Sequence, residues 1–229
     1  CGFTRKDYKF TGWNTEADGS GKSYADRGAL GELKGNLTLY AQWKHKDGWF
    51  WDAQGKQYYR DGELQKTGWT EIGGNTYYLD ESTGYAAEDG IYWLPYPEGY
   101  GPDQWELDNN KDYTANGHDK NSYFLFDKDG VFQADKNGMY ELAADTKVVG
   151  GKAETLGEAR IVWMVKGELP WHPGMVTVDG AYFYFTTGYF EKGKSFVADT
   201  DYYVSKTNDL QWPDTAGWGE GSFTLGTYS

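Results

Sequence analysis

Two aromatic pairs recur along the chain at a spacing that suits ligand recognition. A Gly-Trp pair and a Tyr-Tyr pair each return about 20 residues later, as Gly48-Trp49 and Gly68-Trp69, and as Tyr58-Tyr59 and Tyr77-Tyr78. Indole and phenol rings stack on flat apolar faces such as those of sugars, and their π-faces attract cations. Successive side chains of a strand point to opposite faces, so each Tyr-Tyr doublet sends one ring to each face. The ligand-binding members are predicted to be Trp49, Tyr59, Trp69 and Tyr78. The alternative is that Trp49, Tyr58, Trp69 and Tyr77 face the core of the array.

A second aromatic group lies in a turn-rich insertion that begins at Pro95 and is interrupted by Pro and Gly. Such loops line sugar-binding platforms, and equally they plug the end of a repeat array. The predicted ligand-binding residues at this insertion are Trp93, Tyr96, Tyr100 and Trp105. A third candidate group comprises Trp163, Trp171, His172, Tyr182 and Tyr184, of which Trp163 is expected in the core because it lies within an apolar strand.

Motifs for catalysis and metal binding are scarce. The three histidines do not have the spacing of a metal-binding HExxH motif, and the sequence contains no Gly-x-Ser-x-Gly elbow or Gly-rich phosphate loop. Two carboxylates could serve a glycosidase, but 35 acidic residues make a chance pair expected. The segment from Asp108 to Asp119 allows an irregular calcium loop, although Tyr113 stands where an EF-hand needs Gly and a solvated turn is favoured. We therefore predict no enzyme, no metal site and no cofactor.

The charge balance excludes several classes of partner. Lys and Arg number 22 against 35 Asp and Glu, which gives a net charge of −13 at pH 7. A chain this acidic is repelled by nucleic-acid phosphates and anionic membranes, which require clustered basic residues. No apolar run approaches the roughly 18–20 residues of a membrane-spanning helix. The acidic balance instead suits a cationic ligand.

The composition and the spacing of turns predict an all-β fold. The chain has 11 Trp, 20 Tyr and 11 Phe, so these residues should supply much of the core, and its 32 Gly interrupt nearly every helical pattern. Short aromatic or β-branched runs end at Gly turns, as in a series of hairpins. A hairpin of about 20 residues cannot bury its aromatic face alone, so neighbouring hairpins should stack into a solenoid-like array. Three zones are predicted: residues 1–44, the regular repeats at 45–94, and an aromatic loop insertion with degenerate hairpins at 95–229.

The first zone resembles the B-repeat of internalin-like surface proteins. The motifs that carry this resemblance are Phe3-Thr4-Arg5-Lys6, Phe10-Thr11-Gly12-Trp13-Asn14-Thr15 and Leu37-Thr38-Leu39-Tyr40-Ala41-Gln42-Trp43. The resemblance implies a small β-grasp-like module that serves as a spacer or adhesin element. In that family a further strand precedes the Phe-Thr-Arg segment, so a truncated module is expected here.

The 20-residue repeats resemble the cell-wall-binding repeat of the choline-binding type. This resemblance rests on the Gly-Trp and Tyr-Tyr pairs, and it implies a β-hairpin solenoid in which aromatic cages hold a quaternary ammonium or a glucan. Gln57 and Thr76 stand where the family has a cage Trp. The resemblance therefore implies cages that lack one wall, and the aromatic residues outside the repeat become the better candidates.

The sequence as a whole favours non-catalytic attachment over other functions. We expect a module of a bacterial surface protein, at the cell surface or cell wall, that binds a cell-wall polymer or glycan through exposed rings. The alternative is a structural stalk, or an adhesin with a host surface protein as its partner. An accessory part of a glycoside hydrolase is a more distant alternative.

Overall fold

The computed structural model describes residues 2–32, 35–102, 104–109, 114–115, 117–151, 153–157, 159–170, 174–178, 181–185, 188–189 and 197–198. The chain divides into two compact units. Unit 1 comprises Cys1–Glu71 and Tyr77–Ala86, and unit 2 comprises Ile72–Thr76 and Ala87–Ser229. The predicted zone boundaries were drawn from sequence motifs rather than from contacts, and they stay a prediction.

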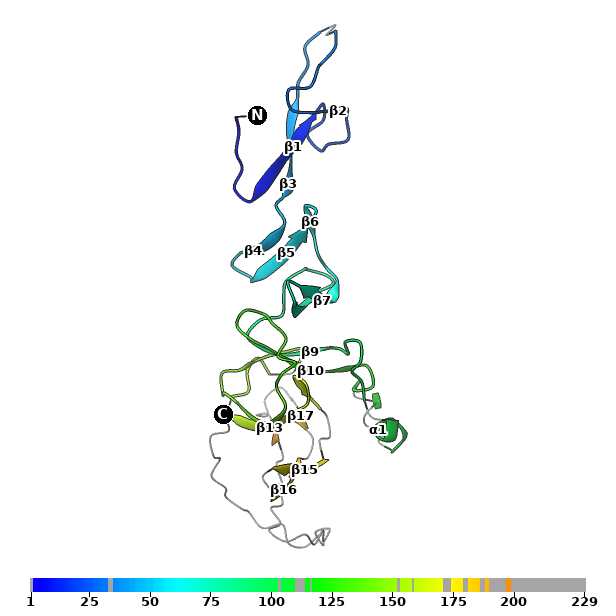
Figure 1. Cartoon of the computed structure of the whole chain (residues 1–229), viewed down its shortest axis with the longest axis vertical. Helices are drawn as coiled ribbons and strands as arrows, with labels where there is room; N and C mark the ends of the chain where they lie inside the picture. The colour runs from blue at the N-terminus through cyan, green and yellow to red at the C-terminus, as the bar shows by residue number, and fades with distance from the viewer. Residues whose placement is uncertain are drawn as a thin grey trace. The chain divides into compact units, whose positions relative to one another are not determined.

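Unit 1 begins with a three-stranded antiparallel sheet in which β1 (Tyr8–Asn14) lies between β2 (Ser23–Tyr24) and β3 (Tyr40–His45) (Figure 1). The register of β1 and β3 shifts between Phe10 and Gly12, which marks a β-bulge. Asn14 is buried, and its Nδ2 donates to the carbonyl oxygens of Gly19 and Gly21, so it fixes the loop after β1. The sheet is part of the all-β fold, whereas its β-grasp-like arrangement stays a prediction.

The repeat segment forms hairpins, as the aromatic motifs predicted. The first is β4 (Gly48–Trp51) and β5 (Lys56–Arg60), extended by the short strand β6 (Glu63–Leu64), and the second is β7 (Gly68–Ile72) and β8 (Asn75–Leu79). Each Gly-Trp pair opens the first strand of a hairpin, and each Tyr-Tyr pair lies in the second. Two-residue turns with positive φ at both positions, Asp61-Gly62 and Gly73-Gly74, join β5 to β6 and β7 to β8. This is the turn geometry whose twist matches an antiparallel pair.

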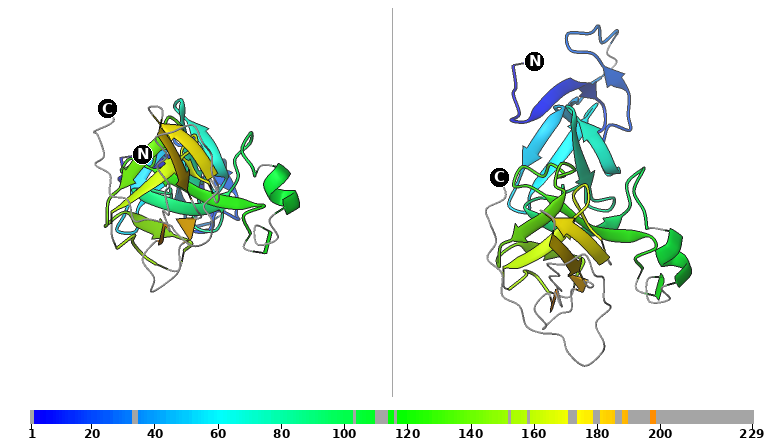
Figure 2. Two further views of the ribbon diagram at one scale, coloured as in Figure 1. Left: turned by 90° about the horizontal axis from the view of Figure 1, so that it is seen from below. Right: turned by 60° about the horizontal axis from the view of Figure 1, so that its bottom comes forward.

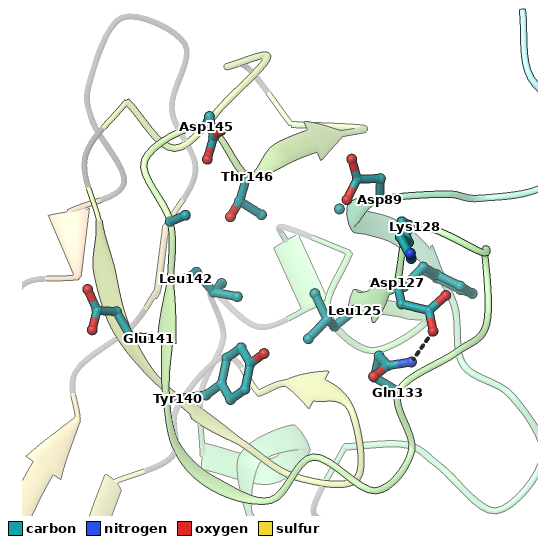
Figure 3. Close-up of a pocket in the computed structure, with 13 residues that line it drawn as sticks. Asp89, Leu125, Asp127, Lys128, Gln133, Tyr140, Glu141, Leu142, Asp145 and Thr146 are labelled. Atoms are coloured by element: carbon teal, nitrogen blue, oxygen red, sulfur yellow. Dashed lines mark hydrogen bonds between the residues drawn. The ribbon is translucent and has the colours of Figure 1, made fainter. Parts of the chain in front are cut away.

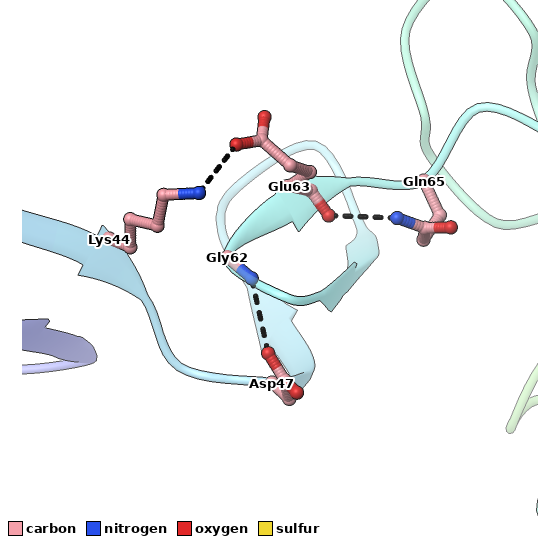
Figure 4. Close-up of polar contacts among 5 residues, drawn as sticks. All are labelled: Lys44, Asp47, Gly62, Glu63 and Gln65. Atoms are coloured by element: carbon pink, nitrogen blue, oxygen red, sulfur yellow. Dashed lines mark hydrogen bonds and ion pairs between the residues drawn. The ribbon is translucent and has the colours of Figure 1, made fainter.

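Polar contacts join the end of β3 and the residues that follow it to the turn before β6 and to β6 itself (Figure 4). The backbone N–H of Gly62 donates to Oδ1 of Asp47 at 3.2 Å, and Nε2 of Gln65 donates to the carbonyl of Glu63 at 3.0 Å. Lys44 forms an ion pair with Glu63 at 3.2 Å, with both side chains largely exposed. Exposed ion pairs contribute little, so these contacts orient the turn more than they stabilise it.

Unit 2 is built on a four-stranded sheet in the order β12-β9-β10-β14, of which Figure 1 labels the two central strands, β9 and β10. Its strands are β9 (Gly90–Pro95), β10 (Asn121–Phe126), β12 (Lys147–Val149) and β14 (Glu168–Leu169), and only the β9–β12 pair is parallel. A second antiparallel pair, β11 (Gly138–Leu142) and β13 (Arg160–Met164), adds its inner side chains to the same core. That core cluster is Ile91, Tyr123, Leu125, Leu142, Val148, Leu156, Val162, Met164 and Leu169. This cluster is mainly aliphatic, whereas the other buried hydrophobic residues include the aromatic residues Tyr77, Tyr92, Phe124, Phe126 and Phe132, in line with the expectation that aromatic residues supply much of the core.

The remaining described elements are short. Two hairpin-like pairs follow the core, formed by β15 (Gly174–Val178) with β16 (Ala181–Phe185) and by β17 (Gly188–Tyr189) with β18 (Val197–Ala198). The helix α1 (Gln104–Asn109) lies in the connection between β9 and β10, away from their sheet in both views (Figures 1 and 2). The prediction of an all-β fold is confirmed, with α1 as an addition inside the segment expected to be a loop. No helix within the described ranges is long and apolar enough to span a membrane.

Candidate ligand-binding surfaces

One face of the first hairpin carries Trp49, Trp51, Lys56 and Tyr58. The antiparallel register pairs Trp49 with Tyr58 and Trp51 with Lys56, and the alternation of side chains places all four on one face. The rings of Trp49 and Tyr58 are 5.0 Å apart, and the Trp49 ring is also 4.8 Å from that of Tyr77 on β8. Neighbouring hairpins of unit 1 thus bury aromatic surface against each other, as the stacking argument predicted.

The Lys56 ammonium lies among these rings. Its Nζ is 4.3 Å from the centroid of the Trp49 ring and 5.0 Å from that of Tyr77, both within the range of cation–π attraction. The side chain is buried, with 4% of its surface exposed. The predicted ligand-binding residue Trp49 therefore contacts a cation that belongs to the chain itself.

The opposite face of the first hairpin presents Phe50 and Tyr59 to residues of the N-terminal sheet. The ring of Tyr59 stacks on that of His45 at 3.9 Å and meets the edge of Phe50 at 5.3 Å. Tyr8 packs on His45 at 4.1 Å. Burial, together with the positive charge of Arg5, lowers the pKa of His45. One π-face of Tyr59 is therefore covered by His45, and a ligand could stack only on what remains.

The second hairpin pairs Trp69 with Tyr78, whose rings meet edge to face at 5.5 Å. Both are half-buried, whereas Tyr77 is buried. Burial is the main cause that raises the pKa of Tyr78, and the nearby charges of Glu81 and Asp80 add to it. Within this doublet the two rings alternate as predicted, since Tyr77 packs against Trp49 while Tyr78 packs against Trp69.

Trp51 is the large aromatic residue that sequence reasoning missed. It is 68% exposed at the end of β4, two residues after Trp49 on the same strand face. The next residue, Asp52, accepts hydrogen bonds from Oη of Tyr85 at 2.7 Å and from the N–H of Gln54 at 2.8 Å. These bonds, the one from Tyr85 first, hold the pKa of Asp52 below its usual value. An exposed indole beside an ionised carboxylate combines a stacking surface with a hydrogen-bond acceptor. The available signal was the i, i+2 spacing from Trp49.

In unit 2, the predicted aromatic residues mostly pack inward. Trp93 lies against the core cluster, with its ring 4.9 Å from that of Tyr123 and 4.6 Å from that of His118. Oη of Tyr96 donates to the carbonyl of His118 at 3.1 Å, and Oη of Tyr100 donates to that of Lys166 at 3.0 Å. These contacts use the rings within unit 2, and both ligand binding by them and their role as a plug of the repeat array stay predictions.

Several aromatic candidates of the C-terminal half lie beyond what the structure describes, and so they remain predictions. Trp105 is in α1, but its side chain is outside the described residues, as are those of Tyr182 and Tyr184 in β16. Trp171 and His172 lie outside them altogether. Trp163 is half-buried in β13, where its neighbours Val162 and Met164 belong to the core.

Unit 2 also contains an open pocket of about 480 Å³ that the sequence did not suggest (Figure 3). Asp89, Asp127, Glu141 and Asp145 are among the residues that line it, together with Tyr140. Nε2 of Gln133 donates to Oδ2 of Asp127 at 3.0 Å, which fixes one wall. None of the eight predicted ligand-binding residues lines this pocket.

The described residues of the segment from Asp108 to Asp119 do not form a set of calcium ligands. Asp108 lies in α1, where its Oδ1 accepts from Nε2 of Gln104 at 3.0 Å, and residues 110–113 are outside the described ranges. Among the residues that are described, no group of three or more His, Cys, Asp or Glu side chains is placed to hold a metal ion.

Comparison with solved structures finds pneumococcal proteins of low similarity. The chain is 22% identical to CbpJ from Streptococcus pneumoniae TIGR4 over 61% of its length and 46% of that chain, with a TM-score of 0.40. The chain is 20% identical to choline binding protein F from Streptococcus pneumoniae. That match covers 60% of this chain and 45% of the pneumococcal protein, with a TM-score of 0.42. The chain is 18% identical to the pneumococcal cell wall endolysin from phage Cp-1, complexed with choline. That match covers 76% of this chain and 39% of the endolysin, with a TM-score of 0.34. The chain thus spans less than half of each of these proteins.

Comparison by sequence identifies the N-terminal segment. No curated protein matches the chain. The model of the Listeria-Bacteroides repeat domain matches residues 2–42, the segment that contains β1, β2 and the first half of β3. This match confirms the predicted resemblance of the first zone, and residues 2–42 are similar to a Listeria-Bacteroides repeat domain.

Proposed function

We propose that this chain is a non-catalytic attachment part of a bacterial surface protein, and that it binds a cell-wall polymer or glycan by ring stacking at the cell surface. The match of residues 2–42 to a repeat domain supports a modular surface protein. The exposed indole of Trp51 carries the proposal of a ligand. A large apolar ring held in water on a regular strand costs free energy that burial against a partner would recover.

The surroundings of Trp51 fit a polyhydroxylated ligand better than a purely apolar one. The π-face of the indole suits the apolar face of a pyranose ring, and the carboxylate of Asp52 can accept a hydrogen bond from a sugar hydroxyl. Tyr85 and Gln54 already hold that carboxylate in place, so little ordering is needed on binding. The rings of Trp49 and Tyr58 form the neighbouring part of the same strand face.

Co-sedimentation with purified cell walls tests this function. We expect the chain to sediment with walls and Trp51→Ala to reduce its affinity about tenfold, which corresponds to the loss of about 1.4 kcal/mol. Phe3→Ala is the matched control, because Phe3 is 70% exposed and lies in the N-terminal segment rather than in the repeats. Competition by soluble wall or glucan oligosaccharides should release the bound protein.

Four results would contradict the proposal. Sedimentation that does not change with Trp51→Ala would remove Trp51 from the site, and no sedimentation with any wall or glucan would favour the structural stalk. Retention on a host protein that glycans do not compete for would favour the adhesin. Release of labelled fragments from the wall polymer would show that the chain has an enzymatic activity.

A further inference from the structure

The buried ammonium of Lys56 is the feature of unit 1 that ring stacking at Trp51 does not use. A primary ammonium is strongly hydrated, and its transfer to a buried site is unfavourable unless other groups replace the lost water. Here Nζ lies 4.3 Å from the Trp49 centroid and 5.0 Å from the Tyr77 centroid, while 4% of the side chain is exposed. The rings take over part of the role of the hydration shell.

The rings come from two hairpins, whereas the cation comes from one of them. The ring centroids of Trp49 on β4 and Tyr77 on β8 are 4.8 Å apart, and that of Tyr58 on β5 is 5.0 Å from that of Trp49. Lys56 begins β5, directly opposite Trp51 in the register, and its Nζ lies near both the Trp49 and the Tyr77 rings. This arrangement of aromatic faces around a cation is the one that recognises quaternary ammonium ligands.

We propose that Lys56 is an internal ligand of the Trp49–Tyr77 cage, and that it closes this cage to external ammonium compounds. The cage then fixes one hairpin to the next instead of binding a soluble cation. Removal of the Lys56 side chain converts the cage into a site for a quaternary ammonium such as tetramethylammonium. The proposal rests on the geometry of the cage and does not depend on ligand binding at Trp51.

The first experiment uses the unmodified protein. Ring currents shift the NMR signals of groups that lie over an aromatic face, so the side-chain Hδ and Hε protons of Lys56 should appear upfield of those of the exposed Lys46. The upfield shift should disappear in Trp49→Leu. Lys56 signals at the positions typical of exposed lysines would overturn the proposal, whatever the variants do.

The second experiment titrates tetramethylammonium chloride into the chain and its variants and follows Trp fluorescence. Lys56→Ala should give a saturable change, whereas the unmodified protein should bind at least about tenfold more weakly, a difference of about 1.4 kcal/mol. Lys56→Met is the matched control, because its apolar side chain fills the cage without a charge and should not restore binding. Sodium chloride and the neutral isostere 2,2-dimethylpropanol should have no saturable effect on Lys56→Ala.

Each outcome bears on the cage. Equal binding by the unmodified protein and Lys56→Ala would show that Lys56 does not close the site, and a folded Lys56→Ala that binds nothing would show that the rings do not form a cation site. Loss of binding in the double variant Lys56→Ala with Tyr77→Leu would support the assignment of the second ring. If Lys56→Ala does not fold, the NMR comparison decides.

Discussion

At the scale of single residues, Asp80 holds the turn that follows β8. Its Oδ1 accepts from the N–H and Oγ of Ser82 at 3.0 and 2.6 Å, and from the N–H and Oγ1 of Thr83 at 2.7 and 2.8 Å. These bonds, that from the Ser82 hydroxyl first, lower the pKa of Asp80 to about 2. We expect Asp80→Ala to lower the free energy of unfolding by about 1 kcal/mol, the usual contribution of a hydrogen-bonded side chain near the surface.

The lowered pKa of Asp80 determines how its contribution to stability depends on pH. The folded pKa lies below the usual value of 3.8, so the stabilisation is complete above that pH and is lost as the pH falls through about 2. Urea unfolding of the unmodified chain and of Asp80→Ala at pH 7 and pH 3 measures this loss of stabilisation. Asp18 provides the control, because it also accepts from the N–H and Oγ of its neighbour Ser20 but is fully exposed, and Asp18→Ala should cost less. Equal costs for the two alanine variants would show that the Thr83 bonds add nothing.

At the scale of elements, Gly84 determines how the segment after β8 packs on β6. Its φ is +77°, and a Cβ there would lie 2.9 Å from Cδ1 of Leu64 and 3.0 Å from the carbonyl oxygen of Gln65. Gly73 has a similar φ of +62° with open space around it. Gly73→Ala therefore costs only backbone strain, about 1–2 kcal/mol, whereas Gly84→Ala adds close contacts with the Leu64 side chain and the Gln65 carbonyl. Thermal unfolding should give a larger decrease for Gly84→Ala, and equal decreases would contradict the packing argument.

The same elements show how far the sequence could be interpreted. The Gly-Trp and Tyr-Tyr pairs predicted both hairpins of the repeat segment, because strand alternation and Gly turns are local properties. The helix α1 was not predicted, since six residues are too few to show a helical period. The burial of Lys56 could not be predicted from the sequence either, because its cage includes Tyr77 from the next hairpin. The exposure of Trp51 depends in the same way on where the neighbouring hairpin ends.

At the scale of the whole molecule, the two units carry opposite pH dependences. In unit 1, the contribution of Asp80 is lost toward low pH. In unit 2, burial of Glu168 in β14 raises the pKa of its carboxyl group from 4.5 to about 7, although hydrogen bonds with Ser122 and Tyr96 act in the opposite direction. Because the folded pKa lies above the unfolded value, unit 2 is unaffected by this group below about pH 4.5 and loses stability as the pH rises to 7.

Glu168→Gln should therefore remove the decrease in stability of unit 2 between pH 4.5 and 7, and at pH 8 it should stabilise the unit by up to about 3 kcal/mol. Amide hydrogen exchange of β10, which pairs with β14, measures this without contribution from unit 1. Glu141→Gln is the control, because Glu141 is an exposed carboxylate of the same unit and should leave the pH dependence unchanged. A direct titration of the Glu168 carboxyl carbon by NMR gives the midpoint. If protection in β10 depends equally on pH in Glu168→Gln and in the unmodified chain, a group other than Glu168 is responsible. The net charge of −13 is then the simplest cause, because repulsion among carboxylates also grows with pH.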